Sequence, residues 1–161
     1  MHQHKKKRKK GTVKDSYTSA LDFLKIRDHT EFELKTKLAK KGYSKEEIDW
    51  ALNKCKEFKF IDDEKFAKAF FEQEKRKLNG PLKIKQNFYK KGLSTDLCDL
   101  LLADYEESEE EYSTAVKYFL KSKFKIDKKQ DLQKKAEAFM RIMSQRGFSK
   151  SVVMRIYENY F

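Results

Sequence analysis

The sequence predicts an all-α protein built from three tandem three-helix repeats. Charged residues make up 40% of the chain and hydrophobic residues 39%, a balance typical of slender helices with wide solvated faces. Thirteen Phe and eight Tyr supply the aromatic surface that disordered chains lack. One Pro and five Gly in 161 residues leave long uninterrupted segments. A turn motif that recurs three times indicates internal repeats.

The recurring motif marks a turn between two helices. Its copies are KGYSKEEIDWAL at 41–52, KGLSTDLCDLLL at 91–102 and RGFSKSVVMRIY at 146–157. Gly42, Gly92 and Gly147 can adopt the left-handed conformation that ends a helix, and the serine two residues later can cap the next helix. Ser44 and Glu47 have the spacing of a capping box. Apolar residues eight and four positions before each glycine, and six and ten after it, form one helical stripe on each side. These residues are Leu34, Leu38, Ile48 and Leu52, then Ile84, Phe88, Cys98 and Leu102, then Phe139, Met143, Val153 and Tyr157.

Each repeat is completed by a helix upstream of its turn motif. The apolar residues of these upstream helices are Ala20, Leu21, Phe23 and Leu24, then Phe66, Ala67, Phe70 and Phe71, then Ala115, Val116, Phe119 and Leu120. The predicted organisation is a basic disordered tail over 1–16, followed by repeats over 17–60, 61–108 and 109–161. Because a three-helix unit buries little apolar surface alone, we expect these helix-turn-helix-like units to pack in an elongated curved array.

The second repeat begins with two adjacent carboxylates, Asp62 and Asp63, just before the apolar run of its first helix. A catalytic pair would require a pocket and a His or metal ligand nearby, and the one His outside the tail is His29. A carboxylate before a helix instead accepts its unpaired backbone N–H groups and is favoured by the positive helix end. We therefore interpret the pair as a helix start. Gly80 and Pro81 separate this helix from the next, with Pro81 in a first-turn position.

The net charge of +12 predicts an anionic partner. Half of the excess lies in residues 1–16, with seven Lys/Arg against one Asp, and between residues 65 and 92 nine Lys/Arg face two Glu. Residues 17–64 balance ten bases against eleven acids. We therefore predict electrostatic contacts from the second repeat, and Arg76 ranks first because a guanidinium presents a planar fork to carboxylate or phosphate. The predicted contact residues are Lys65, Arg76, Lys77, Lys83, Lys85, Lys90 and Lys91.

Other features favour a non-catalytic protein. The sequence has no phosphate loop, metal-ligand cluster or nucleophile with a base, so we expect no enzyme, no cofactor and no metal. Cys55 and Cys98 occupy apolar helical positions without a CxxC motif, which favours burial in a reducing compartment. No apolar run approaches the roughly 20 residues of a membrane span, so a soluble cytoplasmic protein is expected. The acidic segment DYEESEEE at 104–111 is interpreted as a solvated linker with acids at the next helix start, or as a site of self-association with a basic unit or the tail.

The central motifs resemble the RecX family, bacterial regulators of the RecA recombinase in DNA repair, recombination and the SOS response. The resemblance lies in FIDDEKFAKAF at 60–70, followed by Arg76, then NGPLKI at 79–84 and KKGL at 90–93. ALDFLKIRDHTEFELKTKLAKKGYSKEEIDWAL at 20–52 resembles the family's first repeat, and RGFS at 146–149 fits the third. By this match Asp62, Asp63, Phe66, Ala67, Gly80, Pro81 and Gly92 are structural positions, and Gly42 and Gly147 take the equivalent turn positions.

The resemblance implies three three-helix repeats and a non-catalytic role. Such proteins bind the RecA filament on single-stranded DNA, lodge in its groove and suppress strand exchange, ATP hydrolysis and co-protease activity, and some bind DNA directly. We expect a monomer that binds this filament, with non-specific single-stranded DNA as a possible direct ligand. The alternative is a helical nucleic-acid-binding module without a recombinase partner. Specific reading of duplex DNA is disfavoured because SKEEIDWALNKC and STDLCDLLLADY carry acids where a recognition helix needs base-reading residues.

Overall fold

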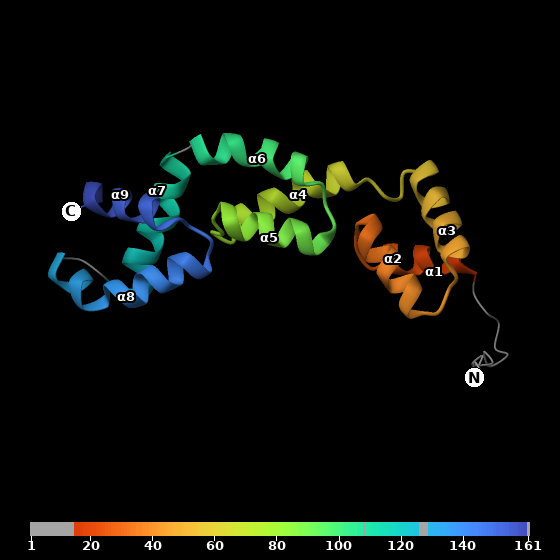
Figure 1. Cartoon of the computed structure of the whole chain (residues 1–161), viewed down its shortest axis with the longest axis horizontal. Coiled ribbons are helices and arrows are strands. Elements are labelled where there is room, and N and C mark those ends of the chain that lie inside the picture. Colours follow the sequence, from red (N-terminus) through yellow and green to blue (C-terminus); the bar gives the residue numbers. More distant parts are fainter. Residues whose placement is uncertain (1–14, 108, 126–128, 161) are drawn as a thin grey trace, which may run out of the picture. The chain divides into compact units, whose positions relative to one another are not determined.

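The computed structural model describes residues 15–107, 109–125 and 129–160 (Figure 1). Nine α-helices and one π-helical turn form the regular structure of these ranges, which confirms the predicted all-α class with three successive groups of three helices. The first repeat holds α1 (Ser16–Leu24), α2 (Glu31–Lys40) and α3 (Lys45–Glu57). The second holds α4 (Asp63–Arg76), α5 (Pro81–Lys91) and α6 (Thr95–Glu107). The third holds α7 (Glu109–Tyr118), the π-helical turn Phe119–Lys123, α8 (Lys129–Gln145) and α9 (Lys150–Tyr160).

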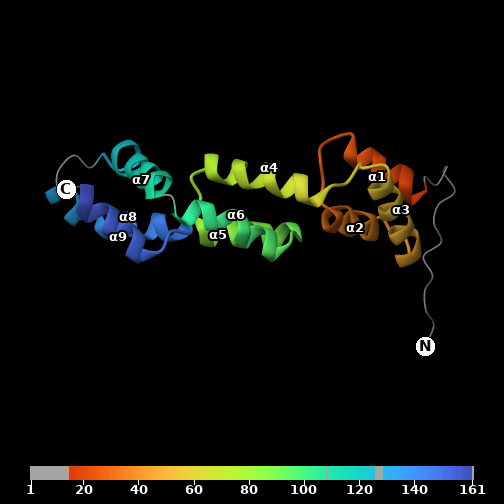
Figure 2. The same cartoon turned by 90° about the horizontal axis from the view of Figure 1, so that it is seen from above.

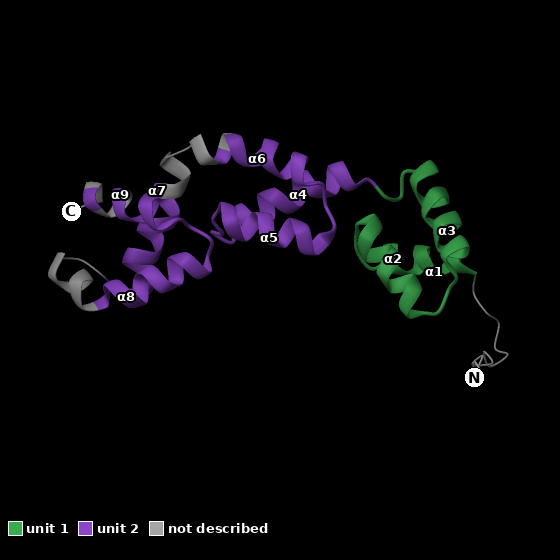
Figure 3. Ribbon diagram, in the orientation of Figure 1, with its two compact units in different colours: residues 1–61 green, residues 62–161 purple. Residues whose placement is uncertain are grey.

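The helices divide between two compact units, residues 1–61 and 62–161 (Figure 3). In unit 1, α1 and α2 both pack against α3, as the view in Figure 2 also shows. Unit 2 contains the second and third repeats together. The repeat boundaries near residues 60 and 108 and the curvature of the array stay predictions. None of the helices in the described ranges combines the length and the hydropathy that a membrane span requires.

Local caps set the helix starts in unit 1. The Asp15 carboxylate accepts a hydrogen bond from the Thr18 backbone N–H at 2.7 Å and begins α1. Thr30 and Ser44 each form a full capping box with the glutamate three residues later, as predicted for Ser44. Ser16 is buried, and its hydroxyl donates to the carbonyl of Glu47 at 2.7 Å. Asp15 and Ser16 therefore belong to the first repeat, whereas residues 1–14 of the predicted tail lie outside the described residues.

The three turn glycines adopt the left-handed conformation that the motif predicts, with φ of 86° at Gly42, 67° at Gly92 and 83° at Gly147. A residue with a Cβ is strained there, which explains why glycine stands at these helix ends. The serine after each turn faces the next helix. The hydroxyls of Ser94 and Ser149 each accept a backbone N–H from three residues on, at 3.4 Å.

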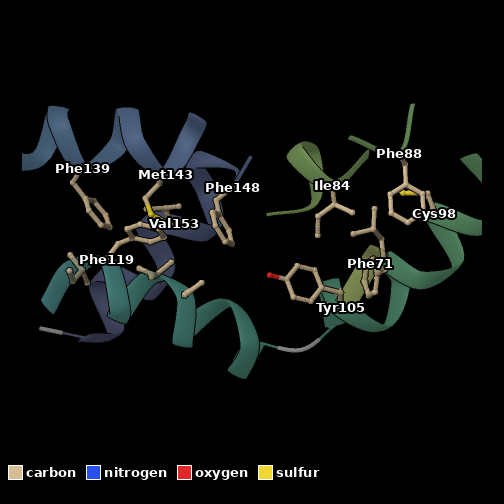
Figure 4. Packing of buried hydrophobic residues seen from close by; sticks show 14 of the residues in the cluster. Phe71, Ile84, Phe88, Cys98, Tyr105, Phe119, Phe139, Met143, Phe148 and Val153 are labelled. Carbon is tan, nitrogen blue, oxygen red and sulfur yellow. The ribbon is translucent and has the colours of Figure 1, made fainter. Parts of the chain in front are cut away.

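The predicted apolar stripes form the cores of both units. Unit 1 is held by a cluster around Ala20, Leu34, Leu38, Ile48, Ala51, Leu52, Cys55 and Ile61. Unit 2 has one cluster that runs through the second and third repeats, and Figure 4 shows its aromatic and aliphatic members facing one another. Of the predicted stripe residues, only the side chain of Tyr157 lies outside the described part. Both cysteines are buried as predicted, and burial raises the pKa of Cys98 to about 11.

The acidic segment 104–111 departs from its predicted linker role. α6 continues to Glu107 and α7 begins at Glu109, so the acids extend two helices rather than a loop. The physical reason is the apolar stripe of α6, in which Leu102 and Tyr105 are buried and hold the helix on the core. Glu109 and the two acids after it stand at the start of α7, as expected for carboxylates at a positive helix end.

Candidate binding surface

Asp62 begins the second repeat as the N-cap of α4. Its carboxylate accepts a hydrogen bond from the backbone N–H of Lys65 at 2.9 Å, and Asp63 follows in the first helical turn. The predicted role of this pair as a helix start is therefore confirmed. Behind it, Ala67 is fully buried and Phe66 packs partly buried on the core. In the part of the chain that the structure describes, no three His, Cys, Asp or Glu residues are grouped so as to hold a metal ion.

Two of the predicted contact residues share the outward face of α4. Lys65 and Arg76 are exposed and stand eleven residues apart, which places them on one side of the helix, roughly 16 Å apart along its axis. Lys68, on the same side, pairs with Glu64 at 2.7 Å. Among the described side chains, neither Lys65 nor Arg76 has an ion-pair partner, so both charges are available to an external ligand.

Lys77 has an internal partner instead. Its ammonium lies 2.8 Å from the carboxylate of Glu74, which is only 1% exposed. The same carboxylate accepts hydrogen bonds from the side-chain amides of Asn79, at 2.8 Å, and Asn87. Burial alone would raise the pKa of Glu74, but the hydrogen bonds from Lys77, Asn87 and Asn79 outweigh it and hold that pKa below its ordinary value. Lys77 therefore neutralises a buried carboxylate, a role that its place in a basic run did not indicate.

The four lysines of α5 lie in different surroundings. Lys85 pairs with Asp99 of α6 at 2.8 Å, and Lys83 donates to the Gln86 side chain at 3.3 Å. Lys91 is half-buried with its ammonium over the rings of Phe66 and Phe70, 5.9 and 5.7 Å from the centroids. Lys90 is exposed. The seven predicted residues therefore occupy separate faces of α4 and α5, and their role in binding stays a prediction.

Sequence reasoning missed three apolar side chains beside these lysines. Leu82 and Tyr89 of α5 are 63% and 78% exposed, and Leu100 of α6 is 69% exposed. Leu82 and Tyr89 lie on the face of α5 opposite the buried Ile84 and Phe88. The sequence does contain a signal for these exposed positions, because Leu82 and Tyr89 fall outside the helical spacing of the buried stripe.

The start of α5 is held by the third repeat. The backbone N–H of Gly80 donates to the carbonyl of Arg146 at 2.7 Å, and that of Leu82 donates to the carbonyl of Gly147 at 3.2 Å. The Arg146 guanidinium donates to the carbonyl of Lys77 at 2.8 Å and to the side-chain oxygen of Asn79 at 3.3 Å. We call this set of contacts between residues 77–82 and 146–147 the turn joint. It fixes where α5 begins and therefore where its outward face lies.

Comparison with known proteins identifies the family. Residues 17–55 match the family described as the first three-helix domain of RecX. The regulatory protein RecX of Vibrio campbellii is 31% identical over 83% of this chain and 84% of its own length. That of Chlorobium limicola is 33% identical over 88% and 87%.

Two solved structures share the fold. A crystal structure of a regulatory protein RecX has a TM-score of 0.74 at 24% identity, over 89% of this chain and 70% of that one. The crystal structure of RecX from Lactobacillus salivarius has a TM-score of 0.72 at 21% identity, over 89% and 93%. Extensive sequence similarity, the matched three-helix domain and the shared fold lead to one conclusion: the chain belongs to the RecX family of non-catalytic regulatory proteins.

Proposed function

We propose that this protein binds the RecA filament on single-stranded DNA, lodges in its helical groove, and inhibits strand exchange, ATP hydrolysis and co-protease activity. Family membership supports RecA regulation as the general role. The observation that carries the more specific proposal is the positive charge of the second repeat, where α5 has four lysines and no acid. We further propose that the protein acts as a monomer in the bacterial cytoplasm.

The mechanism follows from where the charges lie. Lys65 and Arg76 on α4, and Lys83, Lys85 and Lys90 on α5, would meet acidic recombinase surface or nearby phosphates. The turn joint makes the second and third repeats one body, so a contact made by the second repeat also positions the third. A bound body of this kind would block filament extension or promote disassembly. Because the contacts are electrostatic, inhibition should weaken as salt rises.

The test is ATP hydrolysis by the cognate recombinase on single-stranded DNA, with this protein titrated in. A variant with Arg76→Gln, Lys83→Gln and Lys85→Gln is compared with a control that loses the same charge from exposed positions of unit 1, Lys35→Gln, Lys40→Gln and Lys45→Gln. Inhibition by the native chain below one protein per recombinase subunit, lost in the first variant and kept in the control, is the expected result. No inhibition at saturating concentrations of folded protein would refute the proposal.

Direct binding of single-stranded DNA is a second candidate activity, supported by the net charge of +12 and its basic N-terminal segment. The decisive comparison is the salt dependence of oligonucleotide binding by the full chain and by a chain that lacks residues 1–14. The deletion must stop there, because Asp15 caps α1. If all DNA affinity disappears with the segment, the folded repeats do not bind DNA. If it persists and falls in the Arg76, Lys83 and Lys85 variant, the second repeat is a nucleic-acid surface.

A further inference from the structure

Three large apolar side chains are exposed on two adjoining helices of the second repeat. Leu82 and Tyr89 stand seven residues apart on α5, which places them on the same side of the helix about 10 Å apart along its axis. Lys85 lies between them and pairs with Asp99, the residue before Leu100, at 2.8 Å. The ion pair joins α5 to α6, and Leu100, the next residue on α6, is a third exposed apolar side chain. Large apolar side chains exposed on adjoining helices are candidates for an interaction site.

This region is also held in a fixed conformation. Ile84 and Phe88 anchor the inner side of α5 in the core. The backbone N–H of Leu82 is bound by the carbonyl of Gly147 at 3.2 Å, so the first turn of α5 is fixed from the third repeat as well as from its own core. A surface that is already ordered loses little conformational entropy when a partner binds it. The exposed side chains of Leu82, Tyr89 and Leu100 are therefore suited to docking on a complementary protein surface.

The chemistry of the region decides what kind of partner fits it. A nucleic-acid strand could stack a base on Tyr89 and place phosphates beside Lys85 and Lys90. It would, however, meet the exposed carboxylate of Asp99, and Leu82 and Leu100 offer no ring for stacking. An apolar centre with a charged rim is instead the usual arrangement of a protein–protein interface, in which an aromatic anchor fills a pocket of the partner.

We propose that Leu82, Lys85, Tyr89, Lys90 and Leu100, here called the α5–α6 face, dock on a protein surface that has an apolar hollow rimmed by carboxylates. Lys90 complements those carboxylates, Lys85 keeps its ion pair with Asp99, and Tyr89 enters the hollow. This inference rests on the proposed function, since the partner is the recombinase subunits of the filament. It differs from that proposal in making apolar anchors, rather than charge alone, the source of affinity.

The experiment compares a double variant, Tyr89→Ser with Leu100→Ser, with a control of two other exposed apolar residues, Ile26→Ser with Phe32→Ser in unit 1. Three quantities are measured for each folded protein: the concentration that halves recombinase ATP hydrolysis on single-stranded DNA, the affinity for a labelled oligonucleotide alone, and the mass in sedimentation equilibrium. We expect the half-inhibitory concentration of the first variant to rise at least about tenfold, as for loss of interface anchors. DNA affinity and mass should not change, and the control should stay within about twofold.

Each other outcome would overturn the inference in a distinct way. Undiminished inhibition by the variant would remove the α5–α6 face from the contact while the proposed function stands. A parallel loss of oligonucleotide affinity would identify a nucleic-acid occupant. A native dimer that the variant dissociates would identify a second copy of the chain. Failure of the native protein itself to inhibit would refute the proposed function, and this inference with it.

Discussion

The backbone N–H of Gly80 donates to the carbonyl oxygen of Arg146 at 2.7 Å, and so joins the turn before α5 to the turn before α9. A Cβ on Gly80 would lie 2.7 Å from the backbone of Gly147, so the two turns meet without room for a side chain. Arg146 also places its guanidinium 5.3 Å from the ring centroid of Phe119. Two residues 66 positions apart thus form one of the contacts that join the second and third repeats.

Gly147→Ala should destabilise unit 2 strongly. The new Cβ would overlap the backbone N of Lys83, and φ at this position is 83°. We expect a loss of about 3 kcal/mol of unfolding free energy, measured by urea unfolding. Gly42→Ala is the control, because Gly42 has a similar φ of 86° but is exposed, and should cost only about 1 kcal/mol. Equal costs would show that the joint is not tightly packed.

Glu74→Gln should lower stability by about 1–3 kcal/mol near neutral pH, because Lys77 loses its charged partner in a buried network. The pKa of Glu74 lies below its ordinary value of 4.5 in the folded chain. The folded state therefore binds fewer protons, and the stability from this carboxylate is present above pH 4.5 and lost as pH falls through the folded pKa. Unfolding at a series of acidic pH values should show a smaller decline in the variant than in the native protein.

His29 should make unit 1 sensitive to mild acid. Its Nδ1 lies 2.8 Å from the carbonyl of Arg27, and its Nε2 lies 2.6 Å from the Lys37 ammonium. The imidazole is therefore neutral, with Nδ1–H donating and Nε2 accepting. Burial lowers the pKa of His29 below 6.5, Arg27 and Lys37 lower it further, and the Arg27 carbonyl and Glu33 only partly oppose this.

The sign of the His29 effect follows from linkage. Because the folded pKa is depressed, the unfolded chain takes up the proton first, so stability is retained above pH 6.5 and lost as pH falls through the folded pKa. A proton titration of the His29 ring by NMR checks the direction. A midpoint at or above 6.5 would contradict the assigned hydrogen bonds. His29→Gln, which keeps a donor and an acceptor but does not titrate, should lose this part of the pH dependence.

The adjacent residues Arg76 and Lys77 should have different roles. Arg76 should bind the recombinase filament, and Lys77 should stabilise the folded protein. Arg76→Gln removes an exposed charge, and we expect weaker filament inhibition with the unfolding midpoint unchanged. Lys77→Gln should lower the unfolding free energy by about 1–3 kcal/mol, because the buried Glu74 keeps its charge but loses its cation. Parallel inhibition assays and thermal unfolding separate the two effects. A large stability loss in Arg76→Gln would mean that this side chain, too, has a structural role.

The sequence by itself determined the all-α class and the positions at which the three turn motifs end one helix and begin the next. Asp62, Ser44 with Glu47, and Gly42 act on backbone groups within a few positions along the chain, so their roles could be predicted from residue type and spacing. The core stripes could be predicted for the same reason, because a helix places residues three and four apart on one side.

Only the tertiary structure decided which charged residues are buried and which turns contact each other. Glu72 and Glu74 are alike in the sequence, yet Glu74 is buried among Lys77, Asn79 and Asn87 while Glu72 is exposed. In the sequence, Gly80 and Gly147 look like ordinary turn residues. In the structure, their backbones contact each other in the turn joint. Whether a side chain is buried, and which residues it contacts, depends on segments that are distant along the chain and adjacent after folding. A periodic pattern specifies the local helix, not the residue that it will contact.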